Sequence, residues 1–107
     1  MTTISKDRSV VTLINVFTTT PEHQQRVIDL LTEATDRFVR DVAGFIFAGL
    51  HRSLDGAKVT MYSQWRSMDD YQVMRDDPRP LPIFGEILKI ASFEPGSYEV
   101  VATFDPE

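Results

Sequence analysis

Three side chains in the middle of the chain have types that could carry chemistry on an aromatic molecule. His51 and the only tryptophan, Trp65, end two neighbouring apolar segments, and Tyr71 follows six residues after the tryptophan. A histidine can accept a proton near neutral pH. Aromatic walls suit a flat aromatic ligand, which a tyrosine hydroxyl can orient. These residues predict a cavity that binds, and could deprotonate, a hydrophobic aromatic small molecule.

Each of these residues also has a purely structural explanation. A tryptophan and a tyrosine at a strand–helix junction more often pack in a core than line a cavity, and a lone histidine near a hairpin end is more often exposed.

Asn15 is a polar residue in an apolar segment. Its amide either faces solvent or is held inside to bind a substrate oxygen or dioxygen, because an unpaired buried amide costs about 1–3 kcal/mol.

The first half of the chain predicts a strand followed by a helix. Residues 10–17 are apolar on both faces of a period-two pattern, which is typical of a strand covered on both sides. Thr20 is expected to cap a helix with Pro21 in its first position, and the helix is expected to run to about Arg40. An apolar stripe at helical spacing gives this helix a core-facing side: Val27, Leu31, Ala34 and Phe38.

A hairpin follows, with strands at 45–52 and 59–65 and a turn at 53–56 that uses Gly56. Period two places His51 on one face with Phe45 and Phe47, and Trp65 on one face with Met61. Ser67 is expected to cap a second helix, which the prolines at 78, 80 and 82 end. A short helix at 83–91 and a last strand at 97–104 complete the prediction.

This order, β-α-β-β-α-β with a helical insertion, indicates an α+β, ferredoxin-like fold. One domain is expected over residues 1–107, with its core at about 10–104. Helices on one sheet face leave the other face bare, and here both faces are apolar. A homodimer packed sheet to sheet is therefore expected, since a monomer rarely exposes so large an apolar surface.

Composition excludes several classes of partner. The net charge of −5 disfavours nucleic acid, and no apolar run is long enough for a membrane span. The start of the chain has no apolar segment typical of a secretory signal, and there is no cysteine, which fits a cytoplasmic protein. The two histidines are 28 residues apart, and no phosphate-binding loop is present. No metal and no cofactor are expected.

Beyond these patterns, the chain resembles the antibiotic biosynthesis monooxygenase domain. The similar segments are VTLINVFTTTPEHQQRVIDLL, GFIFAGLHRSLDGAKVTMYSQWRSMDDYQVMRDDP and FEPGSYEVVATF, of which LHRSLDG and Y-x-Q-W-x-S are the most specific. The resemblance implies a dimeric α+β barrel that oxidises anthrone-like polyphenols with dioxygen and no prosthetic group. It also implies that Trp65, Tyr71 and His51 line the substrate cavity.

The chain departs from this family at two positions. Quinone-forming members have an asparagine where this chain has Met61, and a cavity arginine of the late helix is replaced near Phe84. The resemblance therefore assigns Met61 and Phe84 to the cavity and leaves Asn15 or His51 to supply a polar group. Related enzymes of the same fold degrade haem, but this chain is not expected to do so, because no histidine follows His51.

The leading hypothesis is a cofactor-independent monooxygenase that acts on an aromatic polyphenol or polyketide intermediate. In it, His51 or a nearby water assists deprotonation, Trp65 and Tyr71 position the ring, and Asn15 steadies the developing anion. The alternatives are a non-catalytic small-molecule-binding dimer, whose cavity Met61 and Phe84 would fill, and a polyketide cyclase of the same fold.

Overall fold

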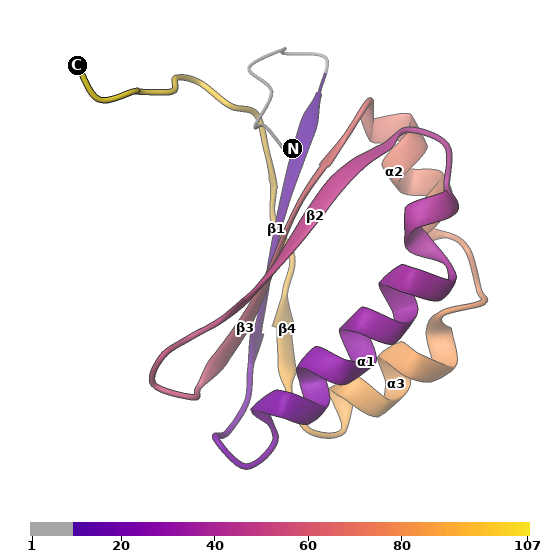
Figure 1. Cartoon of the computed structure of the whole chain (residues 1–107). Helices are drawn as coiled ribbons and strands as arrows, with labels where there is room; N and C mark the ends of the chain where they lie inside the picture. The colour runs from indigo at the N-terminus through magenta and orange to yellow at the C-terminus, as the bar shows by residue number, and fades with distance from the viewer. Residues whose placement is uncertain (1–9) are drawn as a thin grey trace.

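One antiparallel sheet, covered by helices on a single face, makes up the protein (Figure 1). The computed structural model describes residues 10–107, so the first nine residues of the expected domain lie outside the described residues. The sheet has the order β2-β3-β1-β4, and β5 also pairs with β1. The elements are β1 (Val11–Thr18), α1 (Gln24–Arg37), the 3-10 helix η1 (Val39–Asp41), β2 (Phe45–Arg52), β3 (Lys58–Trp65), α2 (Met68–Arg75), α3 (Leu81–Leu88), β4 (Ser92–Glu94) and β5 (Ser97–Tyr98).

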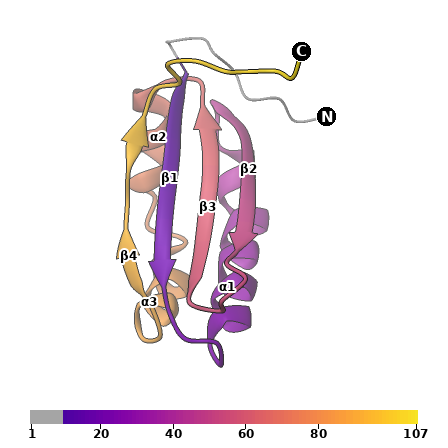
Figure 2. The same cartoon turned by 90° about the vertical axis from the view of Figure 1, so that its left-hand side faces the viewer.

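This arrangement confirms the predicted α+β, ferredoxin-like fold. Helices α1, α2 and α3 lie on the same side of the sheet, and Figure 2 shows the opposite side, over which no helix of the described chain passes. The central strands β1 and β3 pair along their whole length, from Val11 opposite Trp65 to Thr18 opposite Lys58. Cross-strand partners share a face, so this register fixes which residues face the helices.

A β-bulge in β2 corrects the expected faces of that strand. The pairing shifts between Phe45, opposite Trp65, and Phe47, opposite Gln64. A bulge inserts one extra residue into a strand, so the period-two pattern changes face there. Phe45 therefore lies on the helix-covered face with Trp65, whereas Phe47 lies on the bare face, and the prediction that they share a face was wrong.

The first helix begins later than predicted. The backbone N–H groups of His23 and Gln24 both donate to the Thr20 carbonyl, which closes a turn before the helix starts at Gln24. The Thr20 hydroxyl pairs with the His23 ring at 3.1 Å, so it does not cap the helix. The buried Gln24 amide instead donates to the backbone carbonyls of Ser53 and Lys58, both at 3.0 Å, and ties α1 to the hairpin turn.

The predicted last strand, 97–104, is also wrong over most of its length. Only Ser97 and Tyr98 join the sheet, where Tyr98 pairs with Thr12. In an antiparallel pair the next residues run past Val11, where β1 begins. The segment after Tyr98 therefore has no partner strand within the described part of the chain, and Figure 1 shows it leaving the sheet.

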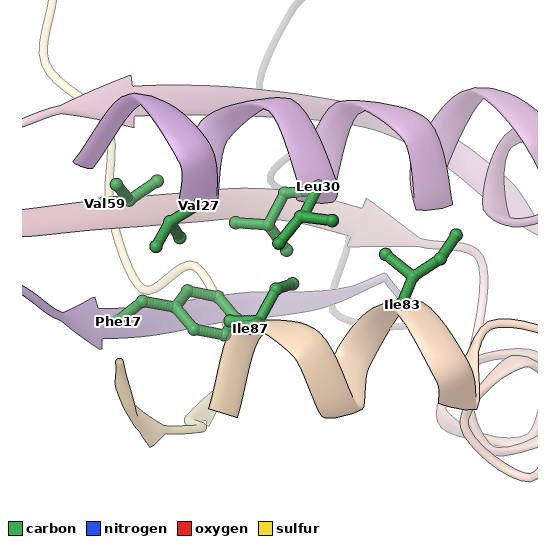
Figure 3. Packing of buried hydrophobic residues seen from close by; sticks show 7 residues of the cluster. Phe17, Val27, Leu30, Val59, Ile83 and Ile87 are labelled. Carbon is green, nitrogen blue, oxygen red and sulfur yellow. The ribbon is translucent and has the colours of Figure 1, made fainter. Parts of the chain in front are cut away.

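The core consists of two groups of buried side chains. The larger joins α1, α3 and the sheet and includes Phe17, Val27, Leu30, Val59, Ile83 and Ile87 (Figure 3). The smaller contains Leu13, Trp65 and Tyr71. Along β1, Asn15 lies between Leu13 of one group and Phe17 of the other. The sequence thus places a polar residue where the apolar core is interrupted.

Candidate active site

A cavity of about 460 Å³ lies between the sheet and the helices, lined by members of both core groups. Leu13, Trp65 and Tyr71 line it from the smaller group, and Phe17 and Ile87 from the larger. This volume is within the range of ligand pockets, about 300–1,000 Å³. The alternative in which side chains fill the space beneath the second helix is therefore not supported.

Three aromatic rings form one wall of this cavity. Trp65 is 1% exposed, and the rings of Phe45 and Tyr71 contact it edge to face, at centroid distances of 5.3 and 5.8 Å. Edge-to-face pairs stabilise one another beyond their apolar burial, by about 0.5–1.5 kcal/mol. The wall is therefore held in place before any ligand binds.

A second aromatic group closes the other end of the cavity. Phe84 of α3 packs edge to face on Phe93, at 5.2 Å, and on Phe17, at 6.3 Å. All three residues line the cavity. The two aromatic groups therefore give the cavity much of its apolar surface, and the polar groups among the lining residues decide which molecule fits.

Asn15 places such a polar group on the cavity wall. It lies opposite Met61 in the β1–β3 register, and both residues line the cavity. Its Oδ1 atom is buried and has no hydrogen-bond partner among the residues that the structure describes. Leaving a buried acceptor unpaired costs about 1–3 kcal/mol, so a ligand hydroxyl that donates to Oδ1 would recover this cost.

Tyr71 supplies the matching donor. Burial raises the pKa of its phenol above the ordinary value of 10.0, and the nearby charge of Arg75 and a hydrogen bond from Asn15 oppose that rise. A partner lowers a phenol pKa when it donates to the phenolate oxygen, so the Asn15 amide N–H donates to Tyr71. The Tyr71 hydroxyl stays protonated at neutral pH and can donate to a ligand oxygen.

Helix α2 positions this tyrosine. Ser67 caps the helix as predicted: its hydroxyl accepts from the backbone N–H of Asp70 at 3.1 Å. The side chains of Ser67 and Arg66 also hold the Asp70 carboxylate, each at 3.0 Å, and the arginine is the larger cause of its lowered pKa. With its start fixed, α2 directs Tyr71 and, one turn later, Arg75 toward the cavity.

The structure brings five of the six predicted site residues together: Asn15, Met61, Trp65, Tyr71 and Phe84 all line the cavity. His51 does not. It is exposed and pairs with Thr60 on the bare face of the sheet, next to Gly49, where an added Cβ would lie 3.2 Å from its ring. Within one chain His51 therefore lies across the sheet from the cavity, and its proposed role as a base stays a prediction.

Sequence reasoning missed Arg75, an exposed residue that lines the cavity. The signal was its position four residues after Tyr71 on a predicted helix, which puts both on one face.

Among the described residues, no group of three or more acidic, histidine or cysteine side chains could hold a metal ion. In the same part of the chain, no helix has the length and apolar character needed to cross a bilayer.

Comparison with known proteins assigns the chain to a family. Residues 10–79 match the antibiotic biosynthesis monooxygenase model. The chain is also 38% identical to tetracenomycin-F1 monooxygenase of Streptomyces glaucescens, over 97% of this chain and 93% of that protein. It therefore belongs to the antibiotic biosynthesis monooxygenase family, as the sequence segments predicted.

Solved structures share the fold. The ActVA-Orf6 monooxygenase of Streptomyces coelicolor, in complex with nanaomycin D, superposes with a TM-score of 0.81 at 24% identity, over 94% of this chain and 95% of that one. SnoaB, a cofactor-independent oxygenase of Streptomyces nogalater, superposes with a TM-score of 0.73 at 21% identity, over 92% of this chain and 99% of that one. At these identities the likeness confirms the ferredoxin-like fold.

Proposed function

We propose that the protein is a cofactor-independent monooxygenase that oxidises an activated methylene of an aromatic polyphenol to a ketone, giving a quinone. The observation that carries this proposal is the pair formed by Asn15 and Tyr71, an unpaired acceptor and a protonated donor on the wall of a mostly apolar cavity. A phenol that donates to one and accepts from the other would satisfy both. The name of the 38% identical relative supports the same reaction class.

The proposed reaction needs only the substrate and dioxygen. The methylene loses a proton to water, and its carbanion transfers one electron to dioxygen. The resulting carbon radical and superoxide form a C–O bond, and protonation gives a hydroperoxide. Its O–O bond then breaks as the remaining C–H proton leaves, so that the methylene and O₂ become a carbonyl and H₂O.

The protein accelerates this sequence by binding and by stabilising charge. Trp65 and Phe45 hold the flat ring, while the Tyr71 hydroxyl donates to the phenolate oxygen onto which the carbanion charge is delocalised. A preorganised donor in a cavity with little water stabilises such charge more than water does. Asn15 orients Tyr71 through its N–H and binds a substrate hydroxyl through Oδ1.

The test is oxidation of a hydroxyanthrone in air, with dioxygen uptake and quinone absorbance recorded together. We expect the protein to raise both rates in equal proportion over the spontaneous reaction, and Trp65→Phe to reduce the acceleration. Equal rates with and without protein would overturn the proposal. Ring closure without dioxygen uptake would instead identify a cyclase, and tight binding without turnover a binding protein.

We also propose that the chain forms a homodimer through the bare sheet face. Half-buried apolar side chains lie there with no helix of the described chain over them, among them Ile14, Val16, Phe47 and Tyr62. The segment after β5 exposes two further apolar residues, Val101 at 82% and Phe104 at 90%. Pairing of this segment with a second copy would cover both surfaces. A cytoplasmic location stays a prediction.

A further inference from the structure

We infer that the substrate carries a carboxylate and that Arg75 binds it at the mouth of the cavity. This inference rests on the proposed function, because it specifies the substrate class of the same cavity. It starts from a residue that neither the family resemblance nor the proposed reaction uses. Arg75 lines the cavity and is exposed, so this residue lies where the cavity meets solvent.

The position of Arg75 relates it directly to the proposed reaction centre. It follows Tyr71 by one helical turn on α2, and residues four apart lie on the same helix face. Its charge also acts on the Tyr71 phenol, where it lowers the Tyr71 pKa against the rise that burial causes. A ring whose hydroxyl contacts Tyr71 would therefore present a substituent on its outer side to Arg75.

The guanidinium is available for a ligand. Arg75 makes no ion pair or hydrogen bond through its side chain with any residue in the described part of the chain. The carboxylate of the cavity-lining residue Asp77 is already taken: Arg79 Nε contacts its two oxygens at 3.1 and 2.9 Å, and Arg79 Nη2 contacts it at 2.6 Å. Arg79 is itself held over the Phe38 ring at 5.3 Å.

The chemistry of this site favours a carboxylate over a neutral group. A guanidinium presents a planar fork of N–H donors that matches the two oxygens of a carboxylate. The chain as a whole has a net charge of −5 and would repel an anion, so binding of an anionic aromatic needs a local cation. Arg75 also lies in the last turn of α2, where a cation interacts favourably with the helix dipole. The experiment must separate this structural role from ligand binding.

The probes are two inert, product-like molecules: an anthraquinone carboxylate and its carboxamide, which has nearly the same shape and no charge. Trp65 is the only tryptophan and lines the cavity, so quenching of its fluorescence reports binding without turnover. We expect the carboxylate to bind roughly tenfold to a hundredfold more tightly than the carboxamide, the range for hydrogen bonds to charged groups. High salt should reduce this preference, since the site is open to solvent.

Two matched variants complete the test. Arg75→Gln should abolish the preference by weakening only carboxylate binding. Arg26→Gln removes the same charge from an exposed arginine of α1 outside the cavity lining, and it should keep the preference. The inference is overturned if the wild type binds both probes equally or if Arg75→Gln keeps the preference. A preference that depends on Arg75, in a protein that oxidises no anthrone, would uphold the carboxylate site and overturn the oxygenase proposal alone.

Discussion

Asn15 on β1 and Met61 on β3 are cross-strand partners that both face the cavity. The family resemblance assigns an asparagine to the position of Met61 in quinone-forming members. In this chain that position has a thioether, which cannot donate a hydrogen bond, and the amide comes from the neighbouring strand. Directly opposed side chains have their Cβ atoms about 4.5–5.5 Å apart, so an amide on either strand can reach the same part of the cavity.

Asn15→Leu should therefore slow anthrone oxidation by about 100-fold or more, because Tyr71, the donor that stabilises the developing charge, would lose the amide that orients it. The loss is expected in kcat, because the charge develops only during the reaction. Steady-state kinetics with dioxygen uptake measure it. An unchanged kcat would show that Asn15 has no part in the reaction.

Transfer of the amide gives a matched control for this prediction. Adding Met61→Asn to Asn15→Leu should recover part of the lost rate, because the amide returns to the same face from the partner strand. Met61→Leu alone keeps the volume nearly constant and should change the rate only a few-fold. If the double variant stays as slow as Asn15→Leu, the two positions are not equivalent in function.

The Tyr71 pKa gives a second prediction that needs no substrate. Because burial raises it, the Tyr71 phenolate should form only above pH 10.0, and Tyr71→Phe should remove this late step from an alkaline ultraviolet titration. The unfolded chain loses this proton at lower pH than the folded chain, so the free energy of unfolding should fall as pH rises through 10.0.

Two groups oppose the rise of the Tyr71 pKa, the Asn15 amide and the Arg75 charge, and removal of either should change this pKa in the same direction. Asn15→Leu takes away the hydrogen bond and Arg75→Gln takes away the nearby charge, so each should raise the Tyr71 pKa further. Arg26→Gln, outside the cavity lining, is the control and should leave it unchanged. A Tyr71 pKa that falls in either cavity variant would contradict the arrangement described.

Local patterns predicted the fold because each one agreed with the sheet pairing that formed. Period two in β3 placed Trp65 and Met61 on the cavity face, and Ser67 capped α2. The wrong details depend on partners that one segment cannot reveal. The bulge before Phe47 arises in the pairing of β2 with β3, and the last strand stops at Tyr98 because β1 provides no further partner.

The sequence predicted the candidate site about as well as it predicted the fold. Aromatic residues at a strand–helix junction left core packing and a cavity wall as alternatives, and the polar Asn15 left a solvent-facing or a buried amide. In the structure the aromatic residues line the cavity and the Asn15 Oδ1 atom is buried. His51 was placed on one face with Phe47 correctly, but which face the helices cover is a tertiary property, and His51 lies on the other one. Arg75 was missed because a charged residue in a last helical turn has an adequate explanation in the helix dipole.

Two glycine substitutions test the backbone, one beside α2 and one inside α3. Gly44 has a φ of +90°, and a Cβ there would lie 2.4 Å from the Asp70 side chain, so Gly44→Ala should lower the free energy of unfolding by at least about 1 kcal/mol. Gly85 lies inside α3 with nothing within 4 Å of its added Cβ, so Gly85→Ala should raise it by about 0.5–1 kcal/mol. Urea unfolding followed by Trp65 fluorescence measures the free energy of unfolding of both variants. Changes of the same sign and size in the two variants would contradict this account.

The proposed homodimer predicts that mass in solution depends on the bare sheet face. Light scattering after gel filtration should give twice the chain mass of 12.2 kDa. Phe47→Lys should shift it toward the monomer, because a lysine on this face would be buried without a partner in the dimer. Removal of residues 100–107 should weaken the dimer as well, by deleting Val101 and Phe104.

A matched substitution outside this face keeps the test specific. Val73 is an apolar residue of α2 that is 67% exposed and lies on the helix side of the sheet, so Val73→Lys should leave the dimer intact. Circular dichroism should show that Phe47→Lys retains its helices. A wild-type mass equal to one chain, or a Phe47→Lys variant that stays fully dimeric, would exclude the sheet-to-sheet arrangement and would leave the cavity of the single chain to be tested by itself.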